Sequence, residues 1–167
     1  GWAQSSHYSP NHQTTRFVPM PDLYKITDEK IKPDALYDVV LADSNGAVAS
    51  FAGVVRDNTG GRRTAYLEYD VYEEMAEKEM RAIGEAVKSK WEVDSVAMLH
   101  GRGRMEIGDI SVLIAISSPH RRASLEACHF AIDQLKESVP IWKKEVWTDG
   151  ETWIQGDPSA SSKGAAQ

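Results

Sequence analysis

The residues best suited to chemistry stand where an apolar run gives way to a predicted helix. The run is followed by Ser117-Ser118-Pro119-His120-Arg121-Arg122, in which Ser118 can cap a helix that has Pro119 at its first position. Amides at a helix start point outward, and the dipole adds positive charge there, so His120 and Arg121 occupy a turn where cations are otherwise unfavourable. This placement is typical of an anion site, and equally of an exposed first turn.

A second basic group lies near the end of the same predicted helix. Lys136 follows Leu135 at the edge of the apolar stripe, and Lys143 and Lys144 come after the next proline. A lysine at that edge can be partly desolvated, which eases loss of its proton. The simpler interpretation, which we favour from these residues alone, is that lysines suit the negative end of a helix dipole.

The spacing of these two groups constrains any site they share. From His120 to Lys136 is 136 − 120 = 16 residues, about 24 Å along a helix. One small anion therefore cannot touch both within a single chain. If they serve one site, the helix must be paired across a symmetric dimer.

Other reactive residues give weaker signals. Cys128 falls on the inward stripe of the helix, where we expect a small core residue rather than a nucleophile. No histidines have a metal-ligand spacing, so we predict no metal and no cofactor. The single cysteine excludes an internal disulfide and favours a reducing compartment, so we expect a cytoplasmic protein.

Composition limits the function classes. The chain has 167 residues, with 19 Lys and Arg against 25 Asp and Glu, a formal net charge of −6. We therefore expect no binding to nucleic acid, and any anion site must be local. The longest apolar run, Val112 to Ile116, is too short to cross a membrane.

The elements that must position these residues form one predicted domain over residues 22–155. Polar, aperiodic sequence predicts a flexible arm at 1–21 and a flexible tail at 156–167. Three- and four-residue spacing of apolar residues predicts a helix over 73–90 and a second that ends near Ser138, with Leu125, Cys128, Ile132 and Leu135 facing inward. Residues 34–41 fit either a helix or a hairpin. Strands are predicted at 23–26, 47–55, 66–72, 93–100 and 110–117, with two more within 141–154 around a turn at 148–150.

The connections between these elements are predicted as loops. Glycines and arginines at 57–63 indicate a mobile basic loop, and 101–104 and 107–109 indicate a loop or bulge. Strands mixed with two long helices give an α+β fold class.

Several stretches carry a resemblance to a known family. They are Phe51 to Asp57, Leu67-Glu68-Tyr69, His100 to Gly108, Ser117 to Arg121 and, most specific, Leu135-Lys136-Glu137-Ser138-Val139-Pro140-Ile141-Trp142-Lys143-Lys144-Glu145. Together they extend over about residues 35–154. The chain resembles the MoaE family, the large catalytic subunit of molybdopterin synthase.

The resemblance implies a fold, a reaction and partners. The fold is an α/β hammerhead with an additional antiparallel β sub-domain, and it favours a helix at 34–41. The family forms a homodimer within a heterotetramer, and a small ubiquitin-like sulfur-carrier subunit (MoaD-like) inserts its C-terminal Gly-Gly tail as a thiocarboxylate. Sulfur passes to cyclic pyranopterin monophosphate, which forms the dithiolene of molybdopterin.

The resemblance also assigns site residues. Lys136 and Lys143 are the expected catalytic residues, and His120 and Arg121 are expected to reach the pocket from the neighbouring subunit. The expected substrate-binding set is Arg56, His120, Arg121, Lys136, Lys143, Lys144 and Glu145. The alternative is a non-catalytic dimeric scaffold that binds a ubiquitin-like tail or a phosphorylated metabolite.

Overall fold

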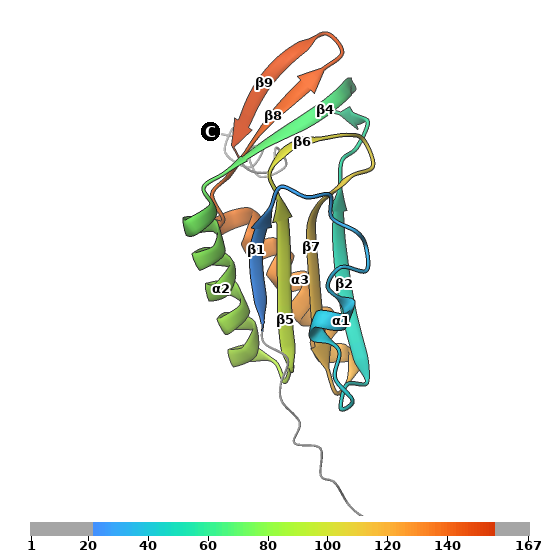
Figure 1. The fold of residues 1–167 in the computed structure, drawn as a ribbon, viewed down its shortest axis with the longest axis vertical. Helices are drawn as coiled ribbons and strands as arrows, with labels where there is room; N and C mark the ends of the chain where they lie inside the picture. Colours follow the sequence, from blue (N-terminus) through green and yellow to red (C-terminus); the bar gives the residue numbers. More distant parts are fainter. Residues whose placement is uncertain (1–21, 156–167) are drawn as a thin grey trace, which may run out of the picture.

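The computed structural model describes residues 22–155, so the predicted arm at 1–21 and tail at 156–167 lie outside the described residues. The described residues form two sheets and three helices, and the strands of the two sheets are interleaved along the chain (Figure 1). The elements are β1 (Leu23–Thr27), α1 (Tyr37–Val40), β2 (Ala47–Val54), β3 (Asn58–Thr59), β4 (Arg62–Val71), α2 (Glu73–Lys90), β5 (Ser95–Gly101), β6 (Gly103–Met105), β7 (Ile110–Ser118), α3 (Arg121–Ser138), β8 (Ile141–Trp147) and β9 (Gly150–Gln155).

The larger core surrounds a four-stranded sheet in the order β1-β5-β7-β2. Every residue of β7 is buried, as the apolar run from Val112 to Ile116 at its centre predicts. Alternate residues of β5 serve opposite faces: Val96 and Met98 pack in the core beneath α2 and α3, whereas Ala97 packs with Leu36 and Val40 at α1. Figure 1 shows α1 on the face of the sheet opposite α3.

Helix α2 has the bounds predicted from its apolar spacing, whereas α3 differs from its prediction in two ways. The predicted cap at Ser118 is wrong, because Ser118 still pairs with Ala47 of β2 and the N-cap is His120. Leu125 is also not inward, since it is 59% exposed. Small residues, Ser124, Ala127 and Ala131, take inward positions over the first three turns, which allows α3 to lie close to the sheet.

The second sheet is antiparallel, in the order β3-β4-β8-β9 with β6 also paired to β4. The basic segment predicted as a mobile loop is a tight hairpin, in which Gly60 and Gly61 turn with φ of 60° and 84°. Residues 103 and 104, predicted as part of a loop or bulge, instead belong to strand β6. Because β4 leads into α2 and β8 follows α3, this sheet is attached to one end of the helical layer (Figure 1).

The observed arrangement confirms the predicted α+β class. Residues 34–41 contain the helical turn α1 rather than a hairpin. No helix among residues 22–155 is long and apolar enough to cross a membrane.

Candidate functional site

The two lysines singled out in the sequence lie together where the two sheets meet the end of α3. Lys136 and Lys143 line both of two adjoining cavities, of about 70 and 130 Å³. We call these cavities together the lysine pocket. Tyr69, Ser111 and Val112 also line both; His100, Ile132, Leu135, Val139 and Ile141 line the first, and Phe51, Gly53, Val54, Arg56, Thr59, Leu67 and Glu145 the second.

The alternation of strand β8 decides which of its charged residues reach the pocket. Lys143 is paired with Tyr69 and Glu145 with Leu67, and all four line it. Lys144 points to the other face of this sheet. Its Nζ lies 3.1 Å from Oε2 of Glu68 there, so the structure does not bring Lys144 to the pocket.

Glu145 is a buried carboxylate in this basic pocket. Its residue is only 1% exposed, and Oε1 accepts a hydrogen bond of 2.7 Å from Thr64 Oγ1. Within the described residues, Oε2 has no hydrogen-bond partner. A buried acceptor without a donor is costly, so Oε2 is suited to bind a donor from a substrate.

Arg56 and Lys136 are the exposed cations of the pocket. Arg56 lies just after β2 and lines the larger cavity. Lys136 lies in the last turn of α3 and is exposed, so the partial desolvation considered from the sequence is not present in the single chain. Together with Lys143 they offer three cationic groups to an anion in the pocket.

His100 is a pocket residue that the sequence reasoning did not assign to the site. It is 4% exposed, and its Nδ1 lies 2.7 Å from the carbonyl oxygen of Gly101. Burial is the main reason that its pKa falls to about 4, and the charge of Lys136 contributes to this lowering. The Tyr69 ring meets the imidazole edge to face at 5.2 Å. The available signal was a polar residue continuing the buried alternation of Val96 and Met98.

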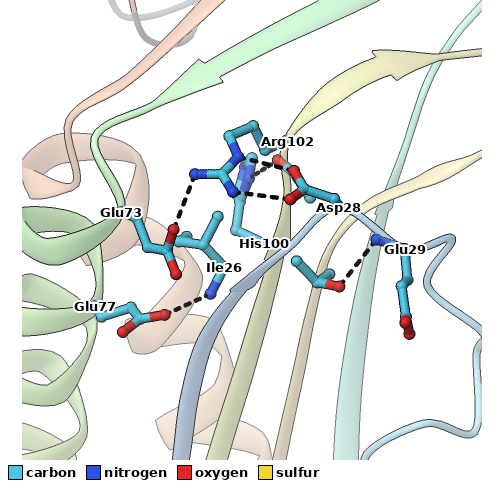
Figure 2. A network of polar contacts seen from close by, with 9 residues as sticks. Ile26, Asp28, Glu29, Glu73, Glu77, His100 and Arg102 are labelled. Atoms are coloured by element: carbon cyan, nitrogen blue, oxygen red, sulfur yellow. Dashed lines mark hydrogen bonds and ion pairs between the residues drawn. The ribbon is translucent and has the colours of Figure 1, made fainter.

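An ion-pair network fixes the chain immediately after His100 (Figure 2). Arg102 donates to both carboxylate oxygens of Asp28, at 2.8 and 2.9 Å, and to Oε2 of Glu73 at 3.0 Å. These contacts lower the pKa of the Asp28 carboxyl and raise that of the Arg102 guanidinium. They connect the end of β1, the start of α2 and the β5–β6 connection.

His120 and Arg121 lie at the opposite end of α3 from Lys136. Both are exposed, and neither lines the lysine pocket. The Ser118 hydroxyl donates to the His120 carbonyl at 2.7 Å instead of capping the helix. The structure therefore confirms the separation expected from the helix length: one chain does not bring this pair to its own lysines.

Cys128 is a core residue of α3. It is 7% exposed, and burial raises the pKa of its thiol to about 11, so it stays protonated at neutral pH. Across the part of the chain that the structure describes, no three His, Cys, Asp or Glu residues gather as a metal site would require.

Comparison with known proteins identifies relatives of this chain. The family model described as MoaE protein matches residues 26–138. The molybdopterin synthase catalytic subunit of Halalkalibacterium halodurans is 45% identical over 131 residues, which cover 78% of this chain and 84% of that protein. The crystal structure of molybdopterin synthase from Staphylococcus aureus superposes with a TM-score of 0.75 at 42% identity, covering 78% of this chain and 96% of that one.

A more distant structure shares the fold. It is the complex of subunits 1 and 2 of molybdopterin-converting factor from Helicobacter pylori, with a TM-score of 0.66 at 24% identity, covering 78% of this chain and 88% of that one. The family match and the bacterial relatives confirm the resemblance stated from the sequence and the class of enzyme it implies. The chain belongs to the MoaE family of molybdopterin synthase catalytic subunits.

Proposed function

We propose that this chain transfers sulfur from the thiocarboxylated C-terminus of a small ubiquitin-like subunit to cyclic pyranopterin monophosphate, forming the dithiolene of molybdopterin. The observation that carries the proposal is the pocket in which Lys136, Lys143, Arg56 and Glu145 converge. A thiocarboxylate and a cyclic phosphate are both anions, and both suit a cationic pocket with one acceptor among its donors.

Each lysine has a role that follows from its charge and place. Lys136 and Lys143 orient the thiocarboxylate, polarise its carbonyl and assist proton transfer as sulfur attacks the pterin. The sulfur arrives on the partner protein, in keeping with the buried, protonated thiol of Cys128. The Gly-Gly tail enters extended, because a chain without side chains fits the small cavity that these lysines line.

Substrate binding is divided between the phosphate and the ring. Arg56 binds the cyclic phosphate together with His120 and Arg121 of a second copy of the chain. Glu145 accepts hydrogen bonds from donors of the pterin through its unpartnered Oε2. The active form is then a homodimer at the centre of a heterotetramer, with two equivalent pockets. The cytoplasmic location stays a prediction.

The enzyme is tested by mixing the purified chain with the thiocarboxylated small subunit and cyclic pyranopterin monophosphate, and measuring molybdopterin. We expect Lys143→Ala to abolish most product formation while binding of the small subunit is kept. Lys144→Ala is the matched control, since this neighbouring lysine points to the other face, and it should retain near-normal activity. A wild-type chain that binds the small subunit but yields no product would instead favour the non-catalytic scaffold.

The shared pocket is tested by subunit complementation. Lys136→Ala and Arg121→Ala homodimers should each be nearly inactive. After subunit exchange, half of the dimers are hybrids in which one pocket is intact and the other carries both changes, so about a quarter of wild-type activity should return. No recovery despite demonstrated exchange would show that each chain builds its own pocket.

A further inference from the structure

We propose that Thr64 is a positioning residue for Glu145, whose carboxylate it holds by one oxygen so that the other is presented to a donor of the pterin. The inference deepens the proposed function and rests on it. It begins from a hydrogen bond between two buried side chains. Thr64 Oγ1 donates to Glu145 Oε1 at 2.7 Å, and the two residues are 3% and 1% exposed. Because both groups are out of water, neither can exchange this bond for one to solvent without moving.

An irregularity of strand β4 brings Thr64 to the pocket face of the second sheet. Side chains alternate along a strand, so Thr64 and Leu67, three residues apart, would ordinarily lie on opposite faces. Their pairing partners on β8 are Trp147 and Glu145, which are two residues apart and therefore share a face. The register shifts just after Thr64, where Ala65 is the extra residue of a β-bulge. The bulge thus turns the Thr64 side chain toward Glu145.

Backbone contacts on both sides hold the bulge in place. The Thr64 amide donates to the carbonyl of Asp57 at 2.9 Å, and the Arg63 carbonyl accepts from the Thr148 amide at 3.0 Å. Threonine suits this place, because its branched Cβ restricts the rotation of the side chain. The hydroxyl is therefore directed at the carboxylate by a part of the backbone that is itself fixed.

The two oxygens of Glu145 have different environments. Oε1 accepts from Thr64, whereas Oε2 has no hydrogen-bond partner among residues 22–155. A carboxylate that served packing alone is expected to have donors at both oxygens, because a buried acceptor without a donor is costly. Glu145 lines the larger cavity of the lysine pocket. The oxygen without a donor thus belongs to a residue of the cavity in which the pterin would bind.

Holding this carboxylate matters because cations surround the same cavity. Arg56 and Lys143 also line it, and an unrestrained carboxylate there would turn toward them. It would then reduce the positive charge offered to the thiocarboxylate and the cyclic phosphate. Held by Thr64, Glu145 keeps Oε2 for the amino and ring N–H groups of the pterin. Thr64 therefore acts on substrate binding through Glu145 and touches no reacting atom.

The direct test is a double-mutant cycle on the affinity of the purified full chain for cyclic pyranopterin monophosphate, measured by calorimetry without the small subunit. Thr64→Val keeps the shape of the side chain but has no hydroxyl, so binding should weaken about tenfold. Thr64→Ser keeps the donor and should bind within about threefold of the wild type. In a Glu145→Ala background, Thr64→Val should change the affinity by less than about twofold, because no carboxylate is left to position.

Kinetics with the thiocarboxylated small subunit separate positioning from a general loss of structure. Thr64→Val should raise KM for the pterin about tenfold, while KM for the small subunit stays within about twofold. Thr27→Val is the matched control, since its hydroxyl accepts from the Glu29 amide at 3.1 Å and Thr27 does not line the pocket. Both of its KM values should be normal. If Thr64→Val does not fold, Thr64→Ala replaces it, because this variant places no methyl group against Oε1.

The outcomes separate this inference from the proposed function. A folded Thr64→Val with normal pterin affinity, or an equal loss in Thr64→Val and Thr64→Ser, would overturn the positioning role. The same loss in the Glu145→Ala background would also overturn it, because the hydroxyl would then act without the carboxylate. A wild-type chain that makes no molybdopterin with a competent partner would refute the proposed function, whereas the binding cycle would still decide the role of Thr64.

Discussion

Acid should destabilise this protein through one residue, His100. Its folded pKa is about 4, against 6.5 for an ordinary histidine. Between these values the unfolded chain binds a proton that the folded chain does not, so the free energy of unfolding falls as pH falls. The stability is fully present above about pH 6.5. From pH 7 to pH 5 the expected loss is about 2 kcal/mol, approaching about 3 kcal/mol near pH 4.

The measurement is urea unfolding followed by tryptophan fluorescence at pH 7 and pH 5, at one protein concentration because assembly also contributes to stability. Asp28, Glu126 and Asp149 have pKa values lowered by ion pairs, so their contributions are lost mainly below this window. His100→Asn removes the titrating group, and its loss from pH 7 to pH 5 should be smaller than that of the wild type by about 2 kcal/mol. Equal losses in the two proteins would refute the reasoning.

Three further substitutions test the packing that supports the site. In Gly84→Ala the new methyl meets the Tyr24 side chain between α2 and β1. The free energy of unfolding, measured in urea, should therefore fall by about 1–3 kcal/mol. In Gly46→Ala the methyl meets the Pro119 carbonyl, next to His120, so substrate affinity should weaken while small-subunit binding, measured by calorimetry, is unchanged. Thr64→Val removes the donor to Glu145 and should lower the free energy of unfolding by about 1–3 kcal/mol; a neutral result would show that Glu145 has another donor.

The spacing of apolar residues predicted correctly those elements whose ends are determined by their own residues. Helix α2 has both predicted bounds because its apolar spacing and charged background are continuous from Glu73 to Lys90. The start of α3 was misjudged because a contact distant in sequence decides it. Pairing of Ser118 with Ala47 extends β7 beyond the residue that would otherwise cap the helix. The position of Leu125 was misjudged because small residues, Ala127 and Ala131, occupy the face against the sheet.

The site was predictable to the extent that charge and spacing are visible in the sequence. The family resemblance named Lys136, Lys143, Arg56 and Glu145, and the structure brings these four to one pocket. Strand alternation alone places Lys143 and Lys144 on opposite faces but does not say which face is inward. His100 was missed because its significance depends on three elements meeting around it, which no local pattern reports.

The net charge of the chain and the charge of its pocket have opposite signs, and this contrast bears on recognition. The whole protein carries −6, whereas Arg56, Lys136 and Lys143 are gathered at one cavity. An acidic surface repels anions everywhere except at such a cationic opening, which concentrates them there. Arg121 and Lys136 lie at opposite ends of α3. In a symmetric dimer, Arg121 of each chain would therefore add positive charge to the pocket of the other chain. Dimerisation would therefore strengthen the attraction for two anionic reactants that a single chain binds with fewer cations.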